Sequence, residues 1–183
     1  MLKSFCGWIL YKCLGWSKDV TVPHSGKFII CLAPHTSNVD FLMGQLYAHA
    51  ENMDINFLMK REWFVGPLGP LLRRIGGIPV WRDKHTSMTD LLSDTALRES
   101  HFRLCITPEG TRSLNPEWKK GFYYIALKAN IPILLYGLDY KRKLIQCTKS
   151  LVPSGDIDKD MIEIKHYFKG FAGRHPEQFT TGD

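Results

Sequence analysis

The chain has 183 residues, 44% of them apolar and 23% charged, a composition typical of one globular domain with a substantial core. Its 24 basic and 18 acidic residues give a net charge of +6, which favours anionic partners such as nucleic acid, phospholipid surfaces or acidic carrier proteins. The five cysteines form no CxxC pair and have no zinc-ligand spacing, so we expect a reducing, cytosolic setting.

Residues 1–18 are rich in aromatic and aliphatic side chains, interrupted at Lys3, Lys12 and Lys18. No small-residue cleavage site follows, which argues against a signal peptide, and the roughly 20 uncharged apolar residues that span a bilayer are lacking. The pattern predicts an amphipathic helix that lies at a membrane surface or, equally by its periodicity, packs on the protein's own core. The function inferred below favours the membrane surface.

Buried strands and helices alternate along the rest of the chain. Residues 28–33 are an apolar run between a glycine and a proline, as in a strand buried on both faces, and residues 38–51 follow as a helix capped by Ser37 or Asn38. Further strands are predicted at 56–59, 78–81, 103–107 and 131–138, an antiparallel edge strand at 143–148, and helices at 86–100, 121–129 and 157–171.

This alternation predicts a single α/β domain with a mostly parallel central sheet flanked by helices. We expect the domain to span residues 19–173, after the amphipathic helix of residues 1–18. Residues 174–183 are expected to form a mobile tail.

His35 and Asp40 stand five positions apart, directly after the first buried strand. A neutral histidine accepts a proton from a hydroxyl when a second group holds its ring tautomer and stabilises the resulting cation, and Asp40 is placed to do so. The pair resembles a serine triad without its serine, so the nucleophile would be the substrate's own hydroxyl. Spacing alone does not separate this pair from an ordinary loop histidine.

Two arginines support a site for an anionic substrate. Arg82 ends the segment Gly76–Arg82, and Arg112 lies in Thr107–Ser113, each of which follows or completes a predicted strand. Guanidinium groups delivered from adjacent strand ends would clamp a phosphate or a carboxylate.

With these motifs in place, the chain resembles the PlsC-like glycerolipid acyltransferase family, typified by bacterial 1-acylglycerol-3-phosphate acyltransferase. Four ordered blocks, within roughly residues 27–138, carry the resemblance: His35 with Asp40, Gly76 with Arg82, Pro108–Ser113, and Ile131–Ile133. The resemblance implies that His35 is the base, that Asp40 orients it, and that the second and third blocks bind the acceptor. The implied acceptor-binding residues are Lys60, Gly76, Arg82, Glu109, Gly110, Thr111, Arg112 and Ser113.

The family resemblance implies transfer of a fatty acyl group from acyl-CoA or an acyl carrier protein to a lyso-lipid hydroxyl, without a metal or cofactor. Pro34, Thr107 and Leu135 depart from the pattern of many relatives, and the chain is shorter than typical phosphatidate-forming members. The acceptor is therefore expected to be 1-acylglycerol-3-phosphate or another lyso-lipid, such as a lyso-amino-acid lipid. Backbone N–H groups near the start of the helix at 38–51 are expected to stabilise the oxyanion.

The expected partners also include a membrane surface with anionic lipid, contacted peripherally from the cytoplasmic side. Nucleic acid is not expected, because the basic residues are dispersed and no DNA- or RNA-reading motif is present. Two alternatives stay open: a catalytically silent membrane-surface protein, and a hydrolase that passes the acyl group to water.

Overall fold

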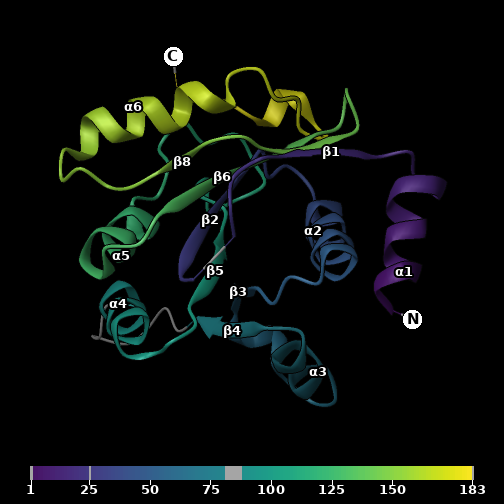
Figure 1. Cartoon of the computed structure of the whole chain (residues 1–183), viewed down its shortest axis with the longest axis horizontal. Helices are drawn as coiled ribbons and strands as arrows, with labels where there is room; N and C mark the ends of the chain where they lie inside the picture. Colours follow the sequence, from purple (N-terminus) through teal and green to yellow (C-terminus); the bar gives the residue numbers. More distant parts are fainter. Residues whose placement is uncertain (1, 25, 81–87, 183) are drawn as a thin grey trace.

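A central eight-stranded sheet organises the residues that the computed structural model describes, 2–24, 26–80 and 88–182 (Figure 1). The strands are β1 (Ser17–Val20), β2 (Phe28–Ala33), β3 (Asn56–Lys60), β4 (Gly77–Val80), β5 (Arg103–Ile106), β6 (Ile133–Asp139), β7 (Leu144–Cys147) and β8 (Ser150–Leu151). Their order is β1-β7-β6-β2-β5-β3-β4, and β8 pairs with β6. Strands β2 to β6 run parallel, while β7 and β8 lie antiparallel to β6, which confirms the predicted mostly parallel sheet.

Helices cover both faces of this sheet. The α-helices are α1 (Leu2–Gly7), α2 (Asn38–Glu51), α3 (Leu68–Arg74), α4 (Met88–Arg98), α5 (Gly121–Ala129) and α6 (Ile157–Phe168). Alternate side chains of β2 enter different cores, because successive residues of a strand point to opposite faces. Ile29 and Cys31 pack with residues of α4, α5 and α6, whereas Phe28 and Ile30 pack with residues of α1 and α2.

A capping box fixes the start of α2. The Ser37 side chain accepts a hydrogen bond from the Val39 N–H, and the Asp40 side chain accepts one from the Ser37 N–H. Asn52, in the left-handed conformation, ends the helix. The helix therefore has the bounds that the sequence predicts, and Asp40 is fixed within its first turn.

The N-terminal segment is helical, with α1 followed by the π-helical turn η1 (Trp8–Cys13). Cys6 and Leu10 are buried in the core that α2 also lines, whereas Leu2, Phe5 and Trp8 are exposed. The segment thus packs on the protein through one face and leaves an apolar face uncovered. No helix of the described residues is long and apolar enough to cross a membrane.

Several expectations need correction. Strand β1 begins at Ser17, so the predicted boundary at residue 18 falls inside a strand. Strand β7 is not at the edge of the sheet, because β1 pairs with its outer side. Helix α3 and the short strand β8 were not anticipated, and neither were the 3-10 turns η2 (Arg61–Trp63) and η3 (Pro176–Gln178).

The C-terminal residues 174–182, which the sequence predicts to be a mobile tail, pack against the rest of the domain. Phe179 packs against the core, and Thr181 is buried. The indole N–H of Trp118 donates to the Thr180 carbonyl, at 3.2 Å. The segment therefore lies on the body of the domain, beside the loop that follows β5.

Candidate active site

His35 and Asp40 meet at the carboxyl end of β2. His35 lies in the loop that leaves the strand, and its Nδ1 is 3.2 Å from Oδ2 of Asp40. The ring is not aligned for a hydrogen bond, so Nδ1 has no hydrogen-bond partner among the described residues. The side chain of His35 is 16% exposed, and its Nδ1 faces the carboxylate.

Asp40 is fully buried, yet both of its oxygens are well supplied with donors. Oδ2 accepts from the backbone N–H groups of Thr36 and Ser37, both at 2.8 Å, and Oδ1 accepts from the Tyr140 hydroxyl at 2.6 Å. Burial raises the pKa of Asp40, but the contacts with His35, Tyr140 and Ser37 outweigh it and hold the pKa below its usual value. The carboxyl is therefore ionised at neutral pH.

Glu109 joins this pair from the loop after β5. Its Oε1 accepts a hydrogen bond from the His35 backbone N–H at 2.8 Å, whereas Oε2 is buried and has no partner in the described part of the chain. Burial raises its pKa to about 7, the His35 N–H opposes this, and the charge of Asp40 adds to it. Glu109 thus ties the loop of His35 to the loop after β5.

The loop 109–117 is held by its own polar groups. The Asn115 amide donates to the carbonyls of Glu109 and Glu117, and the Lys119 N–H donates to the Pro108 carbonyl. Gly110 has φ +66°, and a Cβ atom there would lie 3.1 Å from the Lys119 side chain, so this turn requires glycine. Thr111, Arg112 and Ser113 are exposed at the surface of the loop.

Not every predicted acceptor-binding residue lies here. Gly77 pairs with Phe57 on β3, and Phe57 pairs with a residue of β5 whose partner on β2 lies well before the end of that strand. His35 follows the carboxyl end of β2, so Gly76 lies toward the opposite, amino edge of the sheet. Its φ of +93° and the approach of its Cβ position to within 2.6 Å of the Ile55 carbonyl give it a structural reason to be glycine.

The expectation that the two arginine-bearing segments belong to adjacent strands is wrong, because β3 lies between β4 and β5. Lys60 is exposed at the carboxyl end of β3, the strand that pairs with β5. Of the predicted acceptor-binding cations, it is therefore the one on the strand beside β5. Arg82 lies outside the described residues.

Three backbone N–H groups at the start of α2, where we expect the oxyanion site, are already bonded within the protein. The N–H groups of Thr36 and Ser37 are bonded to Asp40, and that of Val39 is bonded to Ser37. Two of these donors hold the carboxylate and the third binds the Ser37 hydroxyl, so these three are not free for a substrate.

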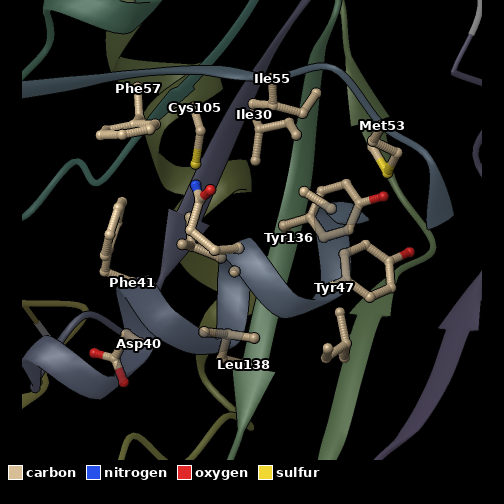
Figure 2. A pocket seen from close by; sticks show the side chains of 15 residues that line it. Ile30, Asp40, Phe41, Tyr47, Met53, Ile55, Phe57, Cys105, Tyr136 and Leu138 are labelled. Atoms are coloured by element: carbon tan, nitrogen blue, oxygen red, sulfur yellow. The ribbon is translucent and has the colours of Figure 1, made fainter. Parts of the chain in front are cut away.

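An apolar pocket lies between α2 and the sheet (Figure 2). Its empty volume is about 620 Å³, part of which is open to solvent. Apart from Asp40 and Gln45, the residues that line it are apolar, aromatic or glycine. Figure 2 shows Asp40 at the margin of the pocket, next to Phe41, with the rings of Phe57, Tyr47 and Tyr136 around the interior. Asp40 of the polar pair therefore forms part of the wall of the apolar cavity.

Comparison with known proteins identifies the family. A model of the family described as Acyltransferase matches residues 18–135, more than half of the chain. The chain belongs to the acyltransferase family. This confirms the resemblance inferred from the four sequence blocks.

Two relatives illustrate the extent of the similarity within the acyltransferase family. Human 1-acyl-sn-glycerol-3-phosphate acyltransferase beta is 28% identical over 113 residues, 58% of this chain and 40% of the human protein. The chain thus spans about two fifths of that relative. The crystal structure of the 1-acyl-sn-glycerophosphate (LPA) acyltransferase PlsC from Thermotoga maritima has the same fold, with a TM-score of 0.61 and 17% identity, over 94% of this chain and 80% of that one.

Two site residues of this acyltransferase-family chain were missed from the sequence. Tyr140 contacts Asp40 across 100 positions of sequence. Gln178, with its amide nitrogen turned toward them, donates to the carbonyls of Thr36 and Arg112. Tyr140 directly follows β6, which pairs in parallel with β2, so its place near His35 becomes clear once these two strands are known to be neighbours. Nothing in the local pattern points to Gln178.

Proposed function

We propose that the protein transfers a fatty acyl group from an acyl thioester to the hydroxyl of a lyso-lipid, with 1-acylglycerol-3-phosphate as the acceptor. The observation that carries this proposal is the contact between His35 and the buried, ionised Asp40 beside an apolar pocket. The names of the two relatives support the acceptor.

Nε2 of His35 takes the proton of the acceptor hydroxyl, since Nδ1 faces Asp40. The acceptor oxygen attacks the thioester carbonyl carbon, and the tetrahedral oxyanion then collapses with cleavage of the carbon–sulfur bond. The thiolate leaves and takes the proton from His35, which restores the neutral ring. Asp40 stabilises the imidazolium between these two steps. No step requires a metal ion or a cofactor.

The surroundings of this pair suit lipid substrates. The pocket between α2 and the sheet offers an apolar wall for a hydrocarbon chain. Exposed Arg112 and Lys60, both at the carboxyl edge of the sheet, supply positive charge for the acceptor phosphate. Acyl-CoA and an acyl carrier protein are both donors that fit the net charge of +6.

The acceptor and product reside in a bilayer, so we place the protein peripherally at a membrane, on its cytoplasmic side. The exposed apolar face of α1, formed by Leu2, Phe5 and Trp8, supports such an association.

The test is an acyl-transfer assay with radiolabelled acyl-CoA and acyl carrier protein donors and a panel of lyso-lipids that includes a lyso-amino-acid lipid. We expect phosphatidate from 1-acylglycerol-3-phosphate. Labelled free fatty acid without lipid product would instead identify a hydrolase, and a lack of turnover with every pair would leave a membrane-binding protein.

The same assay tests the base. We expect His35→Ala to lower kcat by roughly 10²- to 10⁴-fold, the usual contribution of a general base, and Asp40→Asn to lower it less. His166→Ala, at an exposed position of α6, is the control and should retain full activity. Undiminished turnover by His35→Ala would refute the assignment.

A further inference from the structure

The two oxygens of the Asp40 carboxylate are held by different parts of the chain. Oδ2, which faces Nδ1 of His35, accepts both backbone hydrogen bonds from the loop before α2. Oδ1 accepts from the hydroxyl of Tyr140, which directly follows β6. At 2.6 Å this contact has the length of a charge-assisted O–H···O⁻ bond.

Tyr140 is itself held from two sides. Its backbone N–H donates to the Ala172 carbonyl at 2.9 Å, in the segment after α6. Its ring meets that of Trp16 edge to face, with 5.1 Å between the ring centroids. These contacts fix the hydroxyl, so the bond to Asp40 costs little additional ordering.

We propose that Tyr140 is a positioning residue for the acyl transfer: its hydroxyl fixes the Asp40 carboxylate so that Oδ2 stays against Nδ1 of His35. The inference rests on the proposed function, and none of the four sequence blocks includes Tyr140. The two backbone N–H groups bind only Oδ2 of Asp40. The hydrogen bond from Tyr140 to Oδ1 therefore opposes rotation of the carboxylate about its bond to the side chain. Tyr140 acts through Asp40 and does not touch the reacting atoms.

The bond also sets how much of the carboxylate charge reaches His35. The Tyr140 hydroxyl helps to lower the pKa of Asp40, as part of a set of contacts that outweighs burial. Without it, Asp40 becomes more basic and holds a proton on His35 more tightly. Glu109 is coupled by charge to Asp40, and Arg174 acts by charge on Tyr140; neither residue is changed by the substitution. The acid limb of the pH profile should therefore move to higher pH.

Tyr140→Phe tests the proposal, with Tyr123→Phe as its matched control. Tyr123 is buried and donates to Asp160 at 2.8 Å, a similar hydroxyl–carboxylate bond on the face of the sheet that α5 and α6 cover. Both variants lose such a bond, and both should unfold at lower temperature. We expect only Tyr140→Phe to lower kcat, by roughly tenfold, and to move the acid limb of the pH profile of kcat/KM to higher pH.

A histidine NMR titration of the same proteins, with His35→Ala to assign the resonance, gives a readout that does not need turnover. We expect the titration curve of Tyr140→Phe to differ from that of wild type and the curve of Tyr123→Phe to match it. If the titration moves but no protein transfers acyl groups, the proposed function fails and the positioning of the pair stands. If wild type is active and neither the titration nor the pH profile moves in Tyr140→Phe, the positioning role is refuted.

Discussion

Glu109 is a buried carboxyl whose two oxygens differ: Oε1 is bonded to the His35 backbone, and Oε2 has no partner within residues 2–24, 26–80 and 88–182. Its side chain is 2% exposed, and burial is the main cause of its raised pKa of about 7. A carboxyl with a raised pKa binds its proton more tightly in the folded protein than in the unfolded chain. Its favourable contribution is complete below the unfolded value and is lost as the pH rises through about 7.

We therefore expect Glu109→Gln to flatten the pH dependence of stability. In wild type, this one group should lower the free energy of unfolding by about 3 kcal/mol between pH 4.5 and pH 8. The amide does not titrate, although its buried NH₂ group lacks an acceptor, so the variant should be less stable at pH 5 and closer to wild type at pH 8. Urea unfolding across this range measures the difference.

Glu117→Gln provides the control, since Glu117 is exposed in the same loop. Its stability should follow wild type at each pH. Parallel curves for Glu109→Gln and wild type would show that Glu109 has no raised pKa.

The C-terminal segment fastens the two site loops to each other. Gln178 donates to the Thr36 carbonyl at 3.2 Å and to the Arg112 carbonyl at 2.6 Å. The His175 N–H donates to the Thr36 hydroxyl at 3.1 Å. One side of this segment thus joins the loop of His35 to the loop of Arg112.

We expect Gln178→Ala to lower kcat/KM by roughly tenfold, because each lost hydrogen bond is worth about 1 kcal/mol and both hold the distance between the proposed base and the proposed phosphate site. Gln146→Ala is the matched control, because it loses a side-chain hydrogen bond to Asp19 on β1. Steady-state kinetics should show a change for Gln178→Ala alone. Equal kinetics for the two variants would mean that the segment stabilises the fold without aligning the site.

Local signals predicted the elements at the centre of the site. The bounds of β2 and α2 match because an apolar run and a capping box are each encoded within a few residues. Helix α3 was missed because its glycines and prolines suggest a loop; yet Pro70 is its third residue, where the N–H has no partner within the helix anyway. Its neighbour Gly69 is required, since a Cβ would lie 2.8 Å from the Phe64 carbonyl.

The unpredicted features of the site depend on pairings between distant segments. Adjacent positions in sequence do not determine that β3 inserts between β5 and β4, so that these two strands are not neighbours in the sheet. The contact between Tyr140 and Asp40 spans 100 positions and follows from the placement of β6 beside β2. Such relations appear only once the strand order is known.

At the scale of the whole molecule, exposed apolar side chains and positive charge occur together in two places. Phe5 and Trp8 are exposed on the N-terminal helical segment. Trp63 and Val65 are exposed directly after β3, and exposed Lys60 at the end of that strand supplies a positive charge beside them. The end of β3 lies at the same edge of the sheet as His35. A bilayer with anionic headgroups suits both, because rings enter the interface while cations meet the lipid phosphates.

We expect the double substitution of Phe5 and Trp8 by serine to weaken binding to vesicles with anionic lipid by more than tenfold, since each ring loses roughly 1 kcal/mol or more of apolar burial. Trp63→Ser should weaken it as well, by a smaller factor. Co-sedimentation with anionic and zwitterionic vesicles measures both, and added salt should reduce only the anionic component. Ile162→Ser is the control, because Ile162 is 70% exposed on α6, and an equal loss for that variant would exclude a defined membrane-facing surface.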